Sequence, residues 1–214
     1  MHPQVSLSIL NDVEGVLPTR QQRSRDSIVR FLETSEILMR EKHFNDITVE
    51  EFALAAGTSI GAFYKRFEDK NAFFRAILAI ANEEYRQLVA RWPLAFNDLG
   101  FDLRGCIDVI VDTVLLHCTN REGFIRSAVR RARNEADWRP HTQTGQIGID
   151  MAICLLPHIV GAKAEERQRR LEFGFRAIYN VTIRATDDDP YPDALREPSL
   201  PANLADMIYA YWRP

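Results

Sequence analysis

The stretch ITVEEFALAAGTSIGAFYKRFEDKNAF, residues 47–73, decides the fold that the sequence predicts. Thr48 and Glu51 form a T-x-x-E capping box, which marks a helix start because each side chain satisfies a free backbone amide of the first turn. Gly57 follows where this helix would end, and glycine adopts a positive φ there at little cost. A further helix is expected over about 59–67. The stretch therefore predicts two short helices joined by a tight turn at the glycine.

Two short helices joined in this way are typical of the helix-turn-helix, whose second helix enters the DNA major groove while the first crosses the backbone. Hydrogen-bond donors are dense in the second half of the stretch: Thr58, Ser59, Tyr64, Lys65, Arg66 and Lys70. Gly61 and Ala62 are small enough to let the helix approach phosphates and base edges. Ile60 is suited to contact a thymine methyl group. The spacing alone is also compatible with a helical bundle that binds no DNA.

Helical periodicity dominates the rest of the chain, and strand-like alternation is hard to find. Asp69 is a plausible N-cap, and a linker is expected around 93–101. The acidic run 187–189 reads as a loop. Besides the two short helices, we expect helices at about 21–42, 70–92, 102–118, 122–136, 142–156, 163–185 and 202–212. The predicted fold class is therefore all-α.

Composition excludes several classes of protein. Of the 214 residues, 46% are hydrophobic and 27% are charged, which allows a packed core and excludes disorder as the main state. Apolar stretches fall short of the ~20 residues that a membrane span needs, and the first residues do not resemble a signal peptide. The three cysteines lack metal-site spacing and fit a reduced, cytoplasmic protein.

Arginines are concentrated in two places. Arg20, Arg23, Arg25 and Arg30 precede or open the first long helix, where they either contact DNA or form ordinary surface. Between 121 and 135 lie Arg121, Arg126, Arg130, Arg131 and Arg133. This second group either binds an anionic effector, contacts the acidic side of the helix-turn-helix, or forms a solvated helix face.

No enzyme signature is present in the sequence. H-E-x-x-H, the P-loop pattern, G-x-G-x-x-G and C-x-x-C are absent, and no glutamate lies three residues before any histidine, as a di-iron bundle would need. Nothing offers a nucleophile with a base and an orienting group. We therefore expect no catalytic residues, no metal and no cofactor.

The segment Ala56–Phe73, AGTSIGAFYKRFEDKNAF, resembles the recognition signature of TetR-family transcriptional regulators, roughly A-G-V-S-x-G-T/A-x-Y-x-H/Y-F-x-x-K-x-x-L. The preceding ITVEEFA, residues 47–53, is similar to the family's T-T-V-x-x-I-A. The resemblance extends over about 25–73, and it departs from the pattern at His43, Phe63 and Arg66.

The resemblance implies roles for individual residues. The residues implied to contact the phosphates of the DNA backbone are Thr48, Ser59, Tyr64 and Lys70. The positions implied to face the groove and set sequence preference are Ile60, Ala62, Phe63 and Lys65.

The resemblance also implies an N-terminal three-helix helix-turn-helix DNA-binding domain and a helical C-terminal ligand-binding and dimerisation domain. The expected divisions are a flexible arm over 1–18, the DNA-binding domain over 19–69 and the effector and dimerisation domain over 70–214. The implied function is a homodimeric regulator, a repressor released from its operator DNA by a small molecule. The alternative is an all-helical adaptor that binds only protein.

The dimer surface is expected on the last two helices, because the helix over 163–185 is apolar around more than one face. The residues predicted for it are Leu171, Gly174, Phe175, Ile178, Leu204, Met207, Ile208 and Tyr211. The sequence indicates the effector pocket less specifically, since its candidate residues are equally suited to an ordinary hydrophobic core. They are Phe74, Leu78, Phe101, Ile110, Val114, His117, Phe124, Trp138 and Met151.

Overall fold

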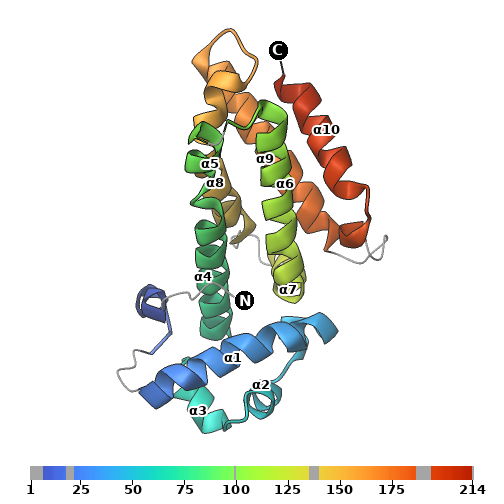
Figure 1. Cartoon of the computed structure of the whole chain (residues 1–214). Coiled ribbons are helices and arrows are strands. Elements are labelled where there is room, and N and C mark those ends of the chain that lie inside the picture. Colours follow the sequence, from blue (N-terminus) through green and yellow to red (C-terminus); the bar gives the residue numbers. More distant parts are fainter. Residues whose placement is uncertain (1–6, 18–21, 99, 135–139, 187–193, 214) are drawn as a thin grey trace. The chain divides into compact units, whose positions relative to one another are not determined.

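A computed structural model of the chain describes residues 7–17, 22–98, 100–134, 140–186 and 194–213. The described residues are all-α (Figure 1). Their only β-type pairing is an isolated bridge between Val16 and Phe67. The chain divides into two compact units. Unit 1 comprises residues 1–84 and 121–138, and unit 2 comprises residues 85–120 and 139–214.

Unit 1 contains the predicted helix-turn-helix and a helix from later in the chain. Its elements are η1 (Leu7–Asp12), α1 (Gln22–Glu41), η2 (Phe44–Asp46), α2 (Val49–Ala55), α3 (Ile60–Tyr64), the first part of α4 (Lys70–Val89) and α7 (Glu122–Asn134). The expected division of domains after residue 69 remains a prediction. By contacts, the beginning of α4 and all of α7 group with the helix-turn-helix.

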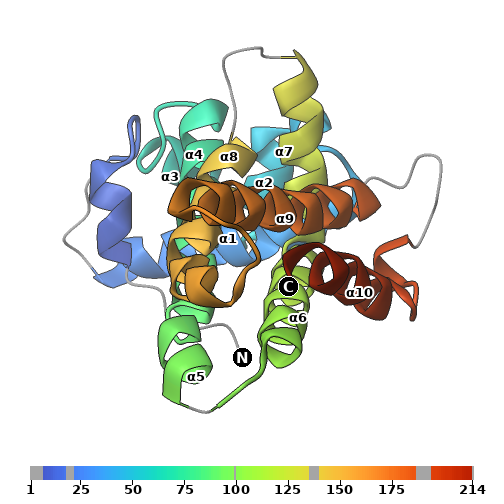
Figure 2. The ribbon, with the colours of Figure 1, turned by 90° about the horizontal axis from the view of Figure 1, so that it is seen from above.

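Unit 2 is a helical bundle. Its elements are the end of α4, α5 (Trp92–Asp98), α6 (Leu103–Asn120), α8 (Pro140–Ala152), η3 (Ile153–His158), α9 (Ala164–Ala185), η4 (Ala194–Arg196) and α10 (Leu200–Trp212). In this bundle α10 packs on α6 and α9, and α8 also packs on α9 (Figure 2). None of the helices among the described residues is long and apolar enough to span a membrane.

The local signals at helix ends are confirmed. Thr48 caps α2 in a complete capping box, and Gly57 has a φ of 60° after it. The Asp69 carboxylate accepts a 2.6 Å hydrogen bond from the backbone N–H of Ala72, so it caps α4. The linker expected around 93–101 is wrong for its first part, where α5 lies. Proline is compatible with a helix in the first turn, and Pro93 is the second residue of α5.

Residues 7–17 correct the expectation of a flexible arm over 1–18. They contain η1, and the strand-like residues after it pair with the chain that follows α3. The backbone N–H of Leu17 donates to the carbonyl of Arg66 (2.7 Å), and that of Glu68 donates to the carbonyl of Gly15 (2.9 Å). Gly15 has a φ of 76°, and a Cβ there would lie 2.7 Å from the Cβ of Ala72, so glycine permits this close approach.

Phenylalanines form the core of unit 1. Phe31 contacts Phe63 edge to face at 5.4 Å between ring centroids, and Phe67 lies 4.8 Å from Phe73. The cluster continues through Phe44, whose ring centroid lies 4.6 Å from that of Phe74. All of these side chains are buried. The apolar stripe predicted on the first helix therefore packs against the inner faces of α3 and α4.

Reciprocal capping joins α1 to α7 within unit 1. The buried Glu36 carboxylate accepts hydrogen bonds from the backbone N–H groups of Gly123 (3.0 Å) and Phe124 (3.3 Å), at the start of α7. In return, the Arg126 guanidinium donates to the carbonyls of Met39 (3.2 Å) and Arg40 (2.6 Å), at the end of α1. Each helix thus satisfies free backbone groups of the other.

The prediction for the dimer surface is wrong at most of its residues. Leu171, Gly174, Phe175, Ile178, Leu204 and Ile208 are all buried inside unit 2 of the single chain. Gly174 accommodates Trp212, because a Cβ there would lie 2.5 Å from the indole Nε1. That indole donates a 2.9 Å hydrogen bond to the carbonyl of Arg170. These side chains hold α9 and α10 together and are not available to a partner.

A different face of the same two helices is apolar and exposed. Met207 and Tyr211, the remaining residues of the predicted set, are 45% and 36% exposed. Phe173 and Val181 of α9 are 62% and 41% exposed. The rings of Phe173 and Tyr211 lie 5.4 Å apart, so the exposed residues of both helices form one surface. We call this surface, Phe173, Val181, Met207 and Tyr211, the α9/α10 face.

Candidate nucleic-acid interface

Two hydroxyl caps shape the helix-turn-helix. Thr48 Oγ1 accepts a 3.1 Å hydrogen bond from the backbone N–H of Glu51, whose carboxylate accepts a 2.8 Å bond from the N–H of Thr48. Ser59 Oγ accepts a 3.2 Å bond from the N–H of Ala62 at the start of α3. Both hydroxyls are exposed and keep their own hydrogen as a donor. Their predicted contact with phosphates is therefore compatible with their capping role.

The turn between α2 and α3 leaves the start of α3 open. Gly57 adopts the left-handed conformation, and no heavy atom would lie within 4 Å of a Cβ built on it. At Gly61, the nearest atom to such a Cβ would be the hydroxyl oxygen of Ser59 at 3.9 Å. The first turn of α3 therefore presents an uncrowded surface at which a phosphate or a base edge can approach.

The helix α3 has one outer and one inner face. Ile60 and Tyr64, which are one turn apart, are 40% and 50% exposed. Lys65 follows as the C-cap of the helix and is exposed, whereas Ala62 is half-buried. The outer face thus combines an apolar side chain, a phenol and an ammonium group, which suit contacts with a thymine methyl group, a phosphate and a guanine.

Phe63 does not face the groove as predicted. Its side chain is 0% exposed and lies between Phe31 and Phe73, with ring centroids at 5.4 and 5.3 Å. The energetic reason is simple, because a phenylalanine gains more free energy from burial in the aromatic core than from exposure to water. Phe63 therefore anchors α3 and is removed from the candidate reading residues.

Lys70 has a role inside unit 1 that the sequence does not reveal. Its Nζ donates a 2.9 Å hydrogen bond to the backbone carbonyl of Asn45 and lies 5.1 Å from the centroid of the Phe44 ring. Partial burial lowers the pKa of Lys70. An ammonium group has three donors, so the predicted phosphate contact stays a prediction, and Lys70 also ties the start of α4 to η2.

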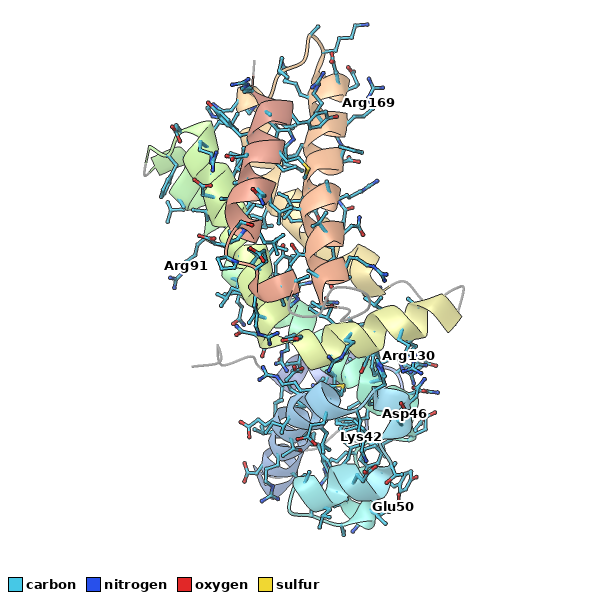
Figure 3. All side chains as sticks on the ribbon, turned by 90° about the vertical axis from the view of Figure 1, so that its right-hand side faces the viewer. Lys42, Asp46, Glu50, Arg91, Arg130 and Arg169 are labelled. Carbon is cyan, nitrogen blue, oxygen red and sulfur yellow. The ribbon has the colours of Figure 1, made fainter. Side chains whose placement is uncertain are left out.

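Acidic residues surround the helix-turn-helix. Figure 3 shows the labelled Lys42, Asp46 and Glu50 at the surface of unit 1. Lys42 forms an ion pair with Glu51, and their hydrogen bond lowers the pKa of the Glu51 carboxyl. Because acids lie beside the cations, the interface is not uniformly basic. We expect it to rely on a few well-placed donors more than on general attraction to DNA.

The arginines of the two groups, at 20–30 and 121–135, differ in their exposure and contacts. Arg30 is exposed on α1, whereas Arg20 lies outside the described residues. Of the second group, Arg121 forms a buried ion pair with Glu84. With the capping contacts of Arg126, two arginines of this group contact α4 and α1 of unit 1, while the three interpretations given for the group as a whole stay predictions. Arg130 is exposed on α7 (Figure 3).

The predicted effector residues do not all lie together. Phe74 and Phe124 pack on each other in the core of unit 1, with ring centroids 5.1 Å apart, so we assign them to that core. Leu78 is half-buried in the same unit. Phe101 is 42% exposed in unit 2 and is not an interior residue. Trp138 lies outside the described residues.

The other effector candidates lie in unit 2. Ile110, Val114 and His117 share the buried face of α6. Met151 on α8 is half-buried. Their contact with an effector stays a prediction.

Comparison with known proteins agrees with this geometry. The sequence profile described as "Bacterial regulatory proteins, tetR family" matches residues 31–77. The resemblance to the TetR family is therefore confirmed over residues 31–77. The matched residues run from Phe31 in α1, through both helices of the helix-turn-helix, to Ile77 in α4. No curated protein sequence matches the chain.

Solved structures extend the likeness of the fold beyond the TetR-family region. A tetR-family transcriptional regulator from Streptomyces coelicolor has a TM-score of 0.66 at 15% identity, over 91% of this chain and 82% of that chain. GusR of Salmonella enterica has a TM-score of 0.62 at 15% identity, over 87% and 95%. NalD of Pseudomonas aeruginosa has a TM-score of 0.58 at 19% identity, over 89% and 98%. The chain therefore has the same fold as these three proteins over most of its length.

Proposed function

We propose that the protein is a cytoplasmic, homodimeric repressor that binds operator DNA through α3 and is released from it by a small molecule. The observation that carries the proposal is the division of α3 into two faces. Phe63 fixes the inner face in the core, while Ile60, Tyr64 and Lys65 are left exposed on the outer face. No chemical step is part of this function.

The α9/α10 face supports the homodimer. Exposed apolar side chains on two adjacent helices are costly in water, and a second copy of the same face covers them. Its members are large, and the Arg170 guanidinium lies 5.1 Å from the centroid of the Tyr211 ring beside them. Aromatic residues, methionine and arginine are the side chains enriched at protein interfaces.

The proposed response to a ligand depends on the distance between the two helix-turn-helix units of the dimer. Two recognition helices must lie about 34–36 Å apart to enter successive major grooves. A small molecule that binds better to a conformation with another spacing weakens DNA binding by its differential affinity, and DNA weakens its binding equally. NalD, one of the structures similar in fold, is described as the secondary repressor of a multidrug efflux pump, which is in keeping with such a role.

The proposal is tested by selecting duplexes from a random pool with the full chain and titrating the selected duplex by fluorescence anisotropy. We expect log affinity to fall linearly with log salt, with a slope of about −0.9 for each phosphate contacted. Light scattering should give a dimer. Absence of any salt-dependent affinity would contradict the proposal and favour a protein-binding adaptor.

A further inference from the structure

Tyr85 buries a hydroxyl group that has no hydrogen-bond partner. It lies on α4 in unit 2, its side chain is 0% exposed, and its Oη finds neither donor nor acceptor among the described residues. Burial raises the pKa of Tyr85 well above its usual value, so the hydroxyl stays protonated and is a donor without an acceptor. Buried polar groups are nearly always paired, so an unpaired one in the interior calls for an explanation.

The surroundings of Tyr85 are aromatic and polar. The ring centroid of His117 on α6 lies 4.7 Å from that of Tyr85. Cys118 and Tyr179 are close enough to affect its pKa, and Tyr179 forms a side-chain hydrogen bond with Thr144 of α8. Helices α4, α6, α8 and α9 therefore each place at least one hydroxyl, imidazole or thiol group in this cluster.

Gly148 lets the hydroxyl of Tyr85 come close to the backbone of α8. A Cβ at Gly148 would lie 2.7 Å from Tyr85 Oη and 2.1 Å from Cζ of Phe175. Any larger residue would displace both side chains. The absence of a side chain at this position leaves the hydroxyl in close contact with the backbone of α8, beside the ring of Phe175.

The interior of unit 2 contrasts in charge with that of unit 1. Glu36, Glu84, Arg121 and Glu122 are buried charged residues, and all belong to unit 1. Among the described residues of unit 2, the buried polar side chains besides the tyrosines and cysteines are His117, Thr144, Thr182 and Thr186. An ionised ligand would therefore find no oppositely charged lysine, arginine, aspartate or glutamate there, and burying it would be costly.

We propose that Tyr85 and the residues around it bind an uncharged, largely aromatic or aliphatic small molecule that offers one hydrogen-bond acceptor to the Tyr85 hydroxyl. This inference rests on the proposed ligand-responsive function and deepens it by naming the chemistry of the effector. We expect carboxylates, phosphates and organic cations to bind this site less well, because the described residues of unit 2 bury no lysine, arginine, aspartate or glutamate.

The first test needs no ligand and compares two tyrosine variants by thermal denaturation of the full chain. Tyr85→Phe removes an unpaired hydroxyl, so its melting temperature should equal or exceed that of the wild type. Tyr179→Phe is the matched control, because it removes a paired hydroxyl and should melt at a lower temperature. Equal losses in both variants would show that the Tyr85 hydroxyl is already satisfied in the free protein, and would overturn the inference.

The second test titrates three probes of similar size at millimolar concentration: acetophenone, isopropylbenzene and benzoate. Ligand-induced shifts in melting temperature should show that acetophenone binds most tightly. Tyr85→Phe should weaken acetophenone about fivefold, the effect of one lost hydrogen bond, and leave isopropylbenzene unchanged. Preference for benzoate, equal binding of acetophenone by both proteins, or no binding of acetophenone would overturn the inference.

Both tests are independent of DNA. If the wild type binds a selected duplex but fails these tests, the ligand site is wrong and the DNA-binding proposal survives. If acetophenone binds as expected but no duplex is selected, the site stands and the proposed regulatory function fails.

Discussion

The Glu36 carboxylate on α1 accepts a 3.0 Å hydrogen bond from the backbone N–H of Gly123, although the two residues are 87 positions apart. Burial raises the pKa of Glu36 above its usual value, despite the opposing hydrogen bonds of Gly123 and Phe124. A Cβ on Gly123 would lie 2.6 Å from backbone atoms of Met39 and Arg40, so this contact requires glycine. The helix that carries the start of the TetR-family region is therefore held directly by α7.

The raised pKa of Glu36 predicts a specific pH dependence of stability. The folded state binds the proton of Glu36 more tightly than the unfolded state, so this residue's contribution to stability decreases as pH rises from about 4.5 through its folded pKa. Glu36→Gln removes the titration, and its free energy of unfolding relative to wild type should rise over this range. Urea denaturation at several pH values measures the difference. Glu33→Gln, an exposed change on the same helix, is the control, and a difference that falls with pH would contradict the assignment.

The buried pair of Glu84 and Arg121 predicts a large effect of single substitutions. Arg121 Nε donates a 2.7 Å hydrogen bond to Glu84, and the side chains of Arg121 and Glu84 are 8% and 10% exposed. Arg121→Met should lower the free energy of unfolding by about 3–5 kcal/mol, because it removes the positive charge that compensates the buried Glu84 carboxylate. The double change with Glu84→Leu should recover much of this loss. Denaturant titration checks both values, and a double variant no more stable than the single one would refute the pairing argument.

Substitutions at Phe63 should affect the stability of the protein, whereas a substitution at Lys65 should affect its DNA sequence preference. Phe63→Ala removes a fully buried ring and should lower stability by about 3–5 kcal/mol. The milder Phe63→Leu should fold and select the same DNA as the wild type, since the side chain does not reach the groove. Lys65→Ala should leave stability nearly unchanged and alter the selected sequence. An altered DNA sequence preference in Phe63→Leu would contradict this assignment and show that Phe63 contributes to base recognition.

Tyr64→Phe isolates one phosphate contact. The ring is half exposed, so loss of its hydroxyl should leave the melting temperature unchanged. Affinity for all duplexes should fall by a similar factor of about five to ten, because a phosphate contact carries no sequence information. Anisotropy titrations with selected and unrelated duplexes measure both factors. Lys70→Ala is a less clean test, since its ammonium group also holds the carbonyl of Asn45.

The α9/α10 face predicts which substitutions produce monomers. Met207→Glu places a charge in the proposed interface and should shift the protein from dimer to monomer in light scattering while preserving its helical circular dichroism. Leu94→Glu, on the exposed side of α5, is the matched control and should stay dimeric. Gly174→Arg should instead unfold unit 2, because the new side chain collides with Trp212. A dimeric Met207→Glu variant would exclude the face.

The sequence predicts those features whose cause is local. The capping box of Thr48 and Glu51, the turn at Gly57 and the Asp69 cap each depend on residues within a few positions of one another, and the structure confirms all three. Helix periodicity also predicts the buried stripe of α1. These local signals were enough to assign an all-α fold and to locate the helix-turn-helix.

What the sequence does not predict depends on residues far apart. The helix α3 has only five residues, too few for periodicity to show that Phe63 lies on its inner face. The apolar pattern of α9 predicts that the helix is buried on more than one side. It does not indicate that Trp212 of the same chain, and not a second copy, packs on the side that carries Gly174. The Glu36 cap and the orphan hydroxyl of Tyr85 likewise involve partners on other helices, so no sequence spacing indicates them.

Selection of DNA from a random pool by the wild type and by Lys65→Ala, each as the full chain, tests the central claim most directly. If α3 reads the major groove in a dimer, the wild type should select a two-fold symmetric site with half-sites centred about 10 base pairs, or a multiple of that, apart. Lys65→Ala should lose its preference at the same base position in both half-sites. Enrichment of no sequence, or of an identical sequence by both proteins, would contradict the claim.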